Sequence, residues 1–242
     1  MQEGQVKIKI LFDKQAIHSN LNTGWGISFL VGENTLFDTG EKGKWLIENM
    51  KRLKVDITKI ENIVISHDHW DHTGGLWRLL ELNNRANLYI TPGFSTEFKE
   101  KAKKFGINII ECKKSCKINE RIFTTGEFMT AYKGYALTEQ SLVIRENNKI
   151  SVLTGCSHPG IVRILQKVKE DFENDNFHLV MGGFHLLNEE EIEIIEVVSQ
   201  LEEFKIDRIG PTHCTGEEAE EIIKNKFGEK FFEVKVGDVV EI

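Results

Sequence analysis

The chain has 242 residues and a formal net charge of −7, which suits one α/β domain with a sizeable core. An acidic chain is a poor candidate for a dedicated nucleic-acid binder, because such proteins usually carry a basic face. No stretch approaches the roughly 18 apolar residues of a membrane span, and the first 12 residues lack the apolar core of a signal peptide. We therefore expect a cytoplasmic protein that forms a single domain over residues 1–242 and does not enter membranes.

Strands and helices alternate along the first half of the chain. Short β-branched or aromatic runs bounded by Gly or Asn predict strands over 6–12, 26–32 and 34–38. Helical spacing follows over 45–53, and a continuous apolar run over 62–66 predicts a buried strand. The pattern continues with a helix over 76–82 capped by Thr73, a strand over 87–91, a helix over 95–105 and a strand over 107–111.

The second half begins with strand after strand and then alternates again. The consecutive strands are predicted over 121–125, 128–132, 141–145 and 150–154. The alternating part comprises a helix over 160–172, a strand over 178–182, a helix over 189–204, a strand over 207–211, a helix over 216–227 and one or two closing strands over 231–242. Hairpins combined with helix–strand alternation predict an αββα sandwich, with two mixed sheets packed face to face and helices on the outer faces.

Metal-ligating side chains are crowded into the turn that follows the predicted buried strand. Residues 67–72 read HDHWDH, so five of six positions are His or Asp. Imidazole suits zinc, iron, cobalt or nickel, and a carboxylate adds a harder ligand. Residues two apart in an extended turn can aim at one ion, so we expect His67 and His69 to share an ion and Asp71 and His72 to face a second one. Two ions roughly 3.5–4 Å apart commonly activate a bridging water.

Three later turns carry the same kinds of side chain. Each is glycine-rich and directly follows a predicted strand, where binding groups tend to collect. The first holds Cys156 and His158, the second His185, and the third His213 and Cys214. These turns are the expected source of the remaining metal ligands.

These motifs resemble those of the metallo-β-lactamase superfamily. HDHWDH matches the HxHxDH signature, and LFDTG over 36–40 resembles the first motif, with Asp38 at its acidic position. Cys156 falls where many members have a Ser-Gly-Asp turn, and His213 falls where the last histidine sits. The resemblance covers nearly the whole chain in order, and it implies the metallo-β-lactamase-like sandwich.

The three later turns together look like one branch of that superfamily. TGCSHPG, MGGFHL and PTHCTG resemble the 7,8-dihydropterin-6-yl-methyl-4-(β-D-ribofuranosyl)aminobenzene 5'-phosphate synthases. Their proposed reaction joins a hydroxymethyl-dihydropterin diphosphate to a ribofuranosyl-aminobenzene phosphate and releases pyrophosphate. HxHxDH itself leaves the substrate open, because lactamases, glyoxalase-type thioesterases, lactonases and RNA nucleases share it.

The chain departs from the superfamily pattern at two places. The third-motif histidine would fall near residues 135–143, where the chain has none. Either Glu139 or His158 fills this place, or the first metal site is depleted. Cys156 replaces the bridging aspartate, and a thiolate favours zinc or iron over magnesium or manganese.

The resemblance implies two divalent metal ions, zinc first, with iron or manganese as alternatives. The predicted ligands of the first ion are His67, His69 and His158, and those of the second are Asp71, His72 and His213, with Cys156 near both. Such ions would lower the pKa of a shared water toward about 7.

Asp71 and His185 are the predicted catalytic residues. His185 would contact the substrate, so its replacement is expected to lower turnover without loss of metal. Asp38 would orient His67 or His69 through a hydrogen bond, or it is a turn-forming Asp that precedes a glycine.

We expect a metal-dependent hydrolase or dihydropterin-type transferase that acts on a phosphorylated or ester small molecule, with no nucleic-acid partner. Trp25, Phe184 and Tyr135 either line a pocket for a flat ring or pack in the core. The alternative is a non-catalytic metal- or ligand-binding sensing module, whose metal would have no open coordination position. The resemblance also allows a homodimer.

Overall fold

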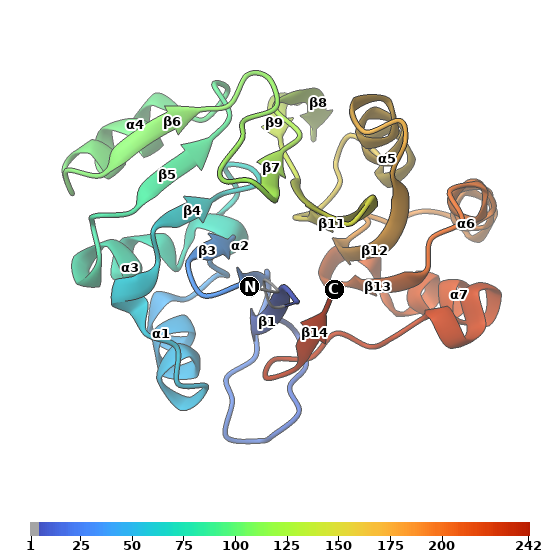
Figure 1. The fold of residues 1–242 in the computed structure, drawn as a ribbon, viewed down its shortest axis with the longest axis horizontal. Helices are drawn as coiled ribbons and strands as arrows, with labels where there is room; N and C mark the ends of the chain where they lie inside the picture. Colours follow the sequence, from blue (N-terminus) through green and yellow to red (C-terminus); the bar gives the residue numbers. More distant parts are fainter. Residues whose placement is uncertain (1–4) are drawn as a thin grey trace. The chain divides into compact units, whose positions relative to one another are not determined.

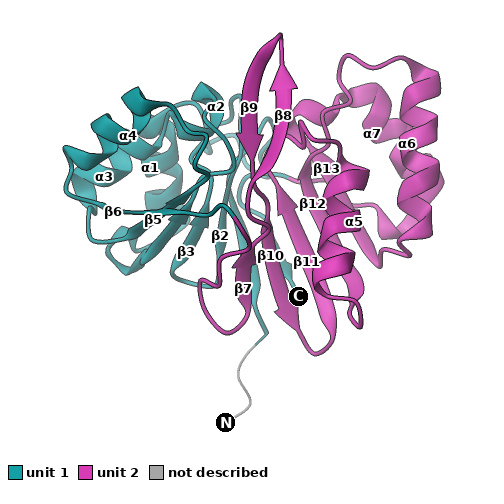
Figure 2. Cartoon of the chain, turned by 90° about the horizontal axis from the view of Figure 1, so that it is seen from above, with its two compact units in different colours: residues 1–113, 235–242 teal, residues 114–234 magenta. Residues whose placement is uncertain are grey.

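A computed structural model describes residues 5–242 (Figure 1). The first four residues, which the signal-peptide expectation includes, lie outside the described residues. The chain forms two compact units: unit 1 runs to Lys113 and takes in Lys235–Ile242, and unit 2 is Lys114–Val234 (Figure 2). The expectation of a single domain over residues 1–242 stays a prediction.

Unit 1 is built on a mixed sheet that has seven strands among the described residues, in the order β14-β1-β2-β3-β4-β5-β6. The strands are β1 (Lys7–Phe12), β2 (Ser28–Val31), β3 (Thr35–Phe37), β4 (Asn62–Val64), β5 (Asn87–Ile90), β6 (Asn108–Glu111) and β14 (Val239–Glu241). Neighbours from β3 to β6 are parallel, whereas β14, β1, β2 and β3 pair antiparallel. The turns after β3 and β4 therefore leave the same edge of the sheet.

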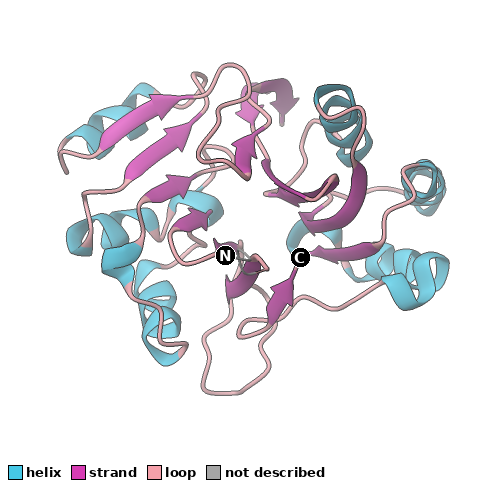
Figure 3. Cartoon of the chain, in the orientation of Figure 1, coloured by secondary structure: helices cyan, strands magenta, loops and turns pink. Residues whose placement is uncertain are grey.

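The helices of unit 1 are α1 (Gly43–Arg52), the 3-10 helix η1 (Ile57–Lys59), α2 (Trp70–Thr73), α3 (Leu76–Leu82) and α4 (Thr96–Lys103). Of these, α1, α3 and α4 cover one face of the sheet (Figure 3). Leu46 and Met50 of α1 are one turn apart and both fully buried in the core of unit 1. The prediction that Thr73 caps helix α3 is wrong: Gly75 holds that position, and the Thr73 hydroxyl donates to the carbonyl of His69 at 3.0 Å.

Unit 2 contains a second mixed sheet, with five strands among the described residues in the order β13-β12-β11-β10-β7, and a separate hairpin. The strands are β7 (Ile122–Thr124), β10 (Leu142–Glu146), β11 (Lys149–Thr154), β12 (Asn176–Gly183) and β13 (Arg208–Thr212), and the hairpin joins β8 (Phe128–Tyr132) to β9 (Tyr135–Glu139). β11, β12 and β13 are parallel, and β10 pairs antiparallel with both β11 and β7.

Strand β9 is missing from the sequence prediction. It follows a two-residue turn in which Lys133 and Gly134 both have positive φ, of 49° and 81°. Such a turn favours Asn-Gly, and Lys-Gly gives a weaker signal. The remaining predicted helices and strands occur in the structure with ends shifted by a few residues, except that the closing region 231–242 holds only the short strand β14.

The helices of unit 2 bury an apolar stripe against its sheet. They are α5 (Ile161–Asp171), α6 (Glu191–Glu203) and α7 (Glu217–Phe227), with the 3-10 helices η2 (His213–Thr215) and η3 (Gly228–Lys230). The buried residues Ile161, Ile164, Leu165 and Val168 of α5 have the spacing of one helix face. Over residues 5–242, none of the helices is both long and apolar enough to cross a bilayer.

Candidate metal centre

The HDHWDH residues of unit 1 follow β4 and run into the short helix α2. His69 is the residue just before α2, so Asp71 and His72 lie in its single turn. His67, Asp71 and His72 are buried. The ring centroid of His67 lies 4.7 Å from that of His69 and 4.2 Å from that of His72. The three imidazoles of the motif are thus gathered at one place in unit 1.

Asp38, at the end of β3, holds this turn. Its Oδ1 accepts the backbone N–H of Ser66 at 2.7 Å, and its Oδ2 accepts the Ser66 hydroxyl at 2.8 Å. The same Oδ2 lies 2.7 Å from Nδ1 of His72. Ser66 Oγ in turn lies 2.8 Å from Nδ1 of His67. Asp38 therefore contacts His72 directly and reaches His67 through Ser66, because β3 and β4 are parallel neighbours whose turns leave the same edge.

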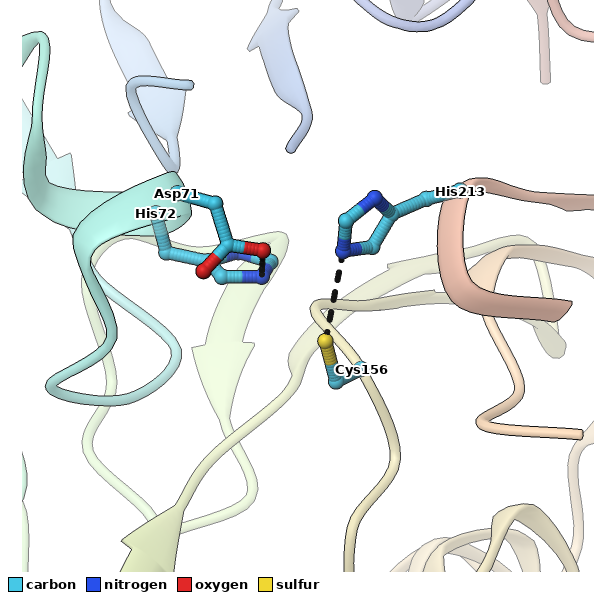
Figure 4. Close-up of side chains that lie close together, drawn as sticks. All are labelled: Asp71, His72, Cys156 and His213. Atoms are coloured by element: carbon cyan, nitrogen blue, oxygen red, sulfur yellow. Dashed lines mark hydrogen bonds and ion pairs between the residues drawn. The ribbon is translucent and has the colours of Figure 1, made fainter. Parts of the chain in front are cut away.

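This network identifies Nε2 as the atom that His67 and His72 would offer to a metal. Figure 4 shows Asp71 and His72 on α2, where His72 Nε2 lies 3.4 Å from a carboxylate oxygen of Asp71. Burial opposes the charged form of His72, but the carboxylates of Asp38 and Asp71 outweigh it and raise the pKa of His72 well above its usual range. A metal would thus displace a proton from this imidazole.

Gly26 makes room for the helix that carries Asp71. Its φ is +98°, and an added Cβ would lie 1.9 Å from the carbonyl oxygen of Asp71. Gly26→Ala is expected to lower the free energy of unfolding by about 3 kcal/mol or more, since steric overlap adds to the cost of a positive φ. Gly32→Ala is the matched control, because Gly32 also has a positive φ (+61°) but nothing within 4 Å of the added Cβ. Urea unfolding of both variants checks this prediction, and equal losses would contradict it.

The predicted ligands of unit 2 lie in the turns after its three parallel strands. Cys156 and His158 follow β11, His185 follows β12, and His213 and Cys214 follow β13. Cys156 Sγ lies 3.3 Å from Nε2 of His213, the contact drawn in Figure 4. Both residues are buried. The strand-end placement of these side chains agrees with the sequence pattern.

Glu139, at the end of β9, anchors the turn after β11. It is fully buried. Its Oε1 accepts the backbone N–H groups of Cys156 and Ser157 at 3.0 and 2.7 Å. Its Oε2 accepts the backbone N–H of His158 at 2.8 Å and lies 2.9 Å from Nδ1 of the same residue. Between the two residues considered for the missing third-motif histidine, this arrangement favours His158 as the ligand, with Glu139 orienting its ring.

The surroundings of Glu139 favour the ionised form of its carboxyl group. Burial opposes ionisation of Glu139, but hydrogen bonds from His158 and the backbone outweigh it and lower the pKa of the carboxyl group. Burial also opposes the thiolate of Cys214, but the Cys156 hydrogen bond and the His213 and His185 rings outweigh it and lower the pKa of this thiol well below its usual range. Cys214 thus favours the thiolate form, which binds metals.

The aromatic residues proposed for a ring-binding pocket differ in burial. Phe184 is 1% exposed and belongs to the core of unit 2, so it packs in the core. Tyr135 is 79% exposed beside the β8–β9 turn, and Trp25 is 37% exposed. Tyr132 of the same hairpin, which the sequence did not single out, places its ring 4.9 Å from that of His158 and 5.5 Å from that of His185.

The sequence pattern did not reveal the supporting roles of two residues, Ser66 and Glu139. Ser66 directly precedes the first histidine of the motif, and its hydroxyl links Asp38 to His67. The polar residue at the end of an apolar strand was the available signal. Glu139 was weighed as a ligand, but its contacts to three consecutive backbone N–H groups depend on a fold that sequence spacing does not reveal.

Comparison with known proteins agrees with this fold and these side chains. Residues 28–105 match the metallo-beta-lactamase superfamily. The chain is 27% identical over 262 residues to the 7,8-dihydropterin-6-methyl-4-(beta-D-ribofuranosyl)-aminobenzene-5'-phosphate synthase of Methanocaldococcus jannaschii, covering 89% of each chain. It is 30% identical to an uncharacterised protein of the same organism, over 86% of this chain and 90% of that one.

A solved structure shares the architecture. The crystal structure of a metal-dependent hydrolase of the beta-lactamase superfamily matches with a TM-score of 0.82 and 28% identity, over 98% of this chain and 99% of that chain. Two mixed sheets with helices, and turns that carry buried His, Asp and Cys side chains, define a protein of the metallo-β-lactamase fold. The chain belongs to the metallo-β-lactamase superfamily, and the fold class predicted from the sequence is confirmed.

Proposed function

We propose that this protein is a metal-dependent enzyme that acts on a phosphorylated or ester small molecule. The observation that carries the proposal is the gathering of the HDHWDH imidazoles in unit 1, with ring centroids 4.2 and 4.7 Å apart. Buried polar rings are costly unless their polar atoms find partners, and Asp38 fixes this set as orienting carboxylates fix metal-bound histidines. A metal ion fits these donors.

The ligand assignment is the one predicted from the sequence, with one or two ions. The proposed ligands are His67, His69 and His158 for one ion and Asp71, His72 and His213 for the other, with Cys156 near both. Nitrogen, carboxylate and thiolate donors favour zinc, with iron or manganese as alternatives. When bound, such ions supply a hydroxide at neutral pH or neutralise a leaving diphosphate.

Neighbouring residues hold the proposed histidine ligands in the orientation that metal binding requires. Asp38 and Ser66 hold the proton-bearing nitrogens of His72 and His67 on the side away from the metal. Glu139 does the same for His158. Rings held in this way offer Nε2 without reorganisation when the metal binds.

Two relatives indicate the substrate class. The dihydropterin-related synthase, 27% identical over 89% of this chain, favours a phosphorylated or diphosphorylated small molecule. The structural relative, a metal-dependent hydrolase, favours hydrolysis as the reaction. A dihydropterin-type transferase and a hydrolase are therefore both proposed, and a non-catalytic sensing module remains the alternative from another class.

Metal content and turnover test the proposal together. Protein purified without added metal is expected to contain one or two equivalents of zinc or iron by mass spectrometry, and to turn over a member of a panel of esters, phosphodiesters and pterin diphosphates. Asp71→Ala is expected to lower turnover at least 100-fold and to lower metal content. His178→Asn is the control, because His178 pairs with Asp207 at the surface. Retained metal without turnover on any substrate would favour the sensing module.

A further inference from the structure

A second group of metal-ligating side chains lies wholly within unit 2. It consists of Cys156, His185 and Cys214, whose two sulfurs and one ring nitrogen all lie within 4.8 Å of one another. The ligand sets derived above use only Cys156 from this group. Cys156 and Cys214 are thiols in the structure and are 4% and 6% exposed.

Cys156, His185 and Cys214 occupy equivalent positions after three neighbouring strands. β11, β12 and β13 are adjacent parallel strands that end at Thr154, Gly183 and Thr212. Cys156, His185 and Cys214 are each the second residue beyond one of those ends. Because carboxyl ends of parallel strands meet at one edge of a sheet, equal offsets bring the three side chains together. This regularity belongs to the backbone and does not depend on unit 1.

Backbone contacts lock the three turns to one another. The N–H of Gly183 donates to the carbonyl of Gly155 at 3.1 Å, and the N–H of Leu187 donates to the carbonyl of Cys214 at 3.1 Å. The Cys214 thiol lies 3.4 Å from the carbonyl oxygen of Cys156. These contacts hold both sulfurs on a rigid frame, as a metal site requires.

Gly183 makes space for the Cys214 sulfur. An added Cβ at this position would lie 2.7 Å from Cys214 Sγ and 2.4 Å from the carbonyl oxygen of Gly155. A glycine is therefore needed for the thiol to occupy its place beside Cys156. The Cys214 sulfur occupies the space that a side chain at position 183 would need.

The His185 ring is positioned without a protein hydrogen bond at Nδ1. Among the described residues, no partner faces this buried nitrogen, and an unmatched buried polar atom costs about 1–3 kcal/mol. The ring packs against two others, with its centroid 4.3 Å from that of His158 and 5.5 Å from that of Tyr132, and it also interacts with the Cys214 side chain. Its backbone has a φ of 56°, a conformation that non-glycine residues adopt mainly where the surrounding structure imposes it.

We propose that Cys156, His185 and Cys214 bind a thiophilic metal ion, with zinc the best match, at a position separate from the centre proposed above. Two thiolates and an imidazole form a soft donor set that suits zinc and excludes magnesium. Three protein ligands leave a fourth position open for water or a substrate atom. Cys156 Sγ also lies 3.3 Å from Nε2 of His213, so this sulfur contacts one proposed ligand of the other centre.

This role for His185 differs from the substrate contact predicted from the sequence, and the two roles give opposite results. If His185 contacts the substrate, its replacement leaves the metal content unchanged. If His185 is a metal ligand, its replacement lowers the metal content. His185 and Cys214 belong to the new position alone, so they are the residues to replace. His185 is partly exposed, so His185→Gln is the variant less prone to misfolding.

Zinc-loaded wild type, His185→Gln, Cys214→Ser and the control Cys116→Ser should be freed of loose metal by gel filtration and analysed by mass spectrometry. Cys116 is a partly exposed thiol of the same unit outside the cluster. We expect His185→Gln and Cys214→Ser each to lose one equivalent per chain and Cys116→Ser to lose none. Circular dichroism verifies that each variant is folded.

Cobalt loading separates this proposal from the proposed function. Thiolate-bound cobalt has an intense charge-transfer band in the near ultraviolet, which is expected to fall by half or more in His185→Gln and Cys214→Ser. Asp71→Ala should lose turnover but keep the greater part of this band, since the new position lies within unit 2. Unchanged metal and an unchanged band in both cluster variants would overturn the proposal. Loss of all metal in both would also overturn it, because the cluster would then belong to one shared centre.

Discussion

Replacing Asp38 by asparagine is expected to lower the metal affinity of the HDHWDH histidines by about 10–100-fold, the range typical of residues that orient metal ligands. The carboxylate accepts at both oxygens: from Ser66 at Oδ1, and from Ser66 and His72 at Oδ2. Asparagine keeps one acceptor oxygen and replaces the other by an NH2 group. That group cannot face the Nδ1–H of His72 without repulsion.

In the wild type, a metal that displaces the Nε2 proton would leave Nδ1–H donating to the Asp38 carboxylate. In the variant, the Nδ1–H of a metal-bound ring would face the amide NH2, whereas a metal-free neutral ring relieves this repulsion by accepting at Nδ1 and carrying its proton on Nε2, the atom that lies 3.4 Å from Asp71. This metal-free tautomer competes with metal binding, so the affinity falls although the side chains keep their places. A carboxylate-to-amide change beside a catalytic histidine acts through the wrong tautomer in the same way.

Competition with a chromophoric chelator at neutral pH measures this effect directly. Asp56→Asn is the matched control, because Asp56 belongs to the same unit and its carboxylate caps η1 at the surface. The control should bind metal as the wild type does. If Asp38→Asn holds zinc as tightly as the control, Asp38 serves the fold of the turn and does not set the state of His72.

The sequence could predict the proposed metal ligands better than the residues that hold those ligands in position. HDHWDH carries its own spacing, and the later histidines follow strands that are recognisable from apolar runs, so both sets could be placed at strand ends. The supporting contacts link residues that are distant along the chain. Asp38 and His72 are 34 positions apart, and Cys156 and Glu139 are 17 apart. Such pairs depend on strand order and register, which periodicity does not reveal.

The same dependence on strand order and register explains why the predicted partner of Asp38 differs from the observed one, His72. An acidic residue one strand before the motif was expected to hold His67 or His69, since these follow the next strand most closely. In the structure the turn reverses at His69 to begin α2, and His72 comes back toward β3. The Thr39 N–H donates to the His72 carbonyl at 3.0 Å, which fixes this return. A four-residue helix gives too short a periodic pattern to be predicted.

Replacing Glu139 by glutamine is expected to lower the free energy of unfolding by about 3 kcal/mol or more. Four donors converge on this fully buried carboxylate: three consecutive backbone N–H groups and Nδ1 of His158. Hydrogen bonds to a charged group contribute about 1.5–3 kcal/mol each, and a buried donor left unmatched costs about 1–3 kcal/mol. Glutamine has nearly the same shape, but its NH2 group must face at least one donor. The loss therefore reflects hydrogen bonding and not packing.

Urea unfolding followed by circular dichroism gives the measurement. Glu120→Gln is the control, because the Glu120 side chain is 90% exposed in its pair with Lys117, and it should change the free energy by less than about 0.5 kcal/mol. A loss of the same size in Glu139→Gln would show that the turn after β11 holds its shape without the carboxylate. The expected larger loss would make Glu139 the residue that fixes the backbone of Cys156 and His158 together. One buried carboxylate would then set the geometry of both ligand-bearing side chains, and the absence of a third-motif histidine would be offset by the residue that holds His158 in its place.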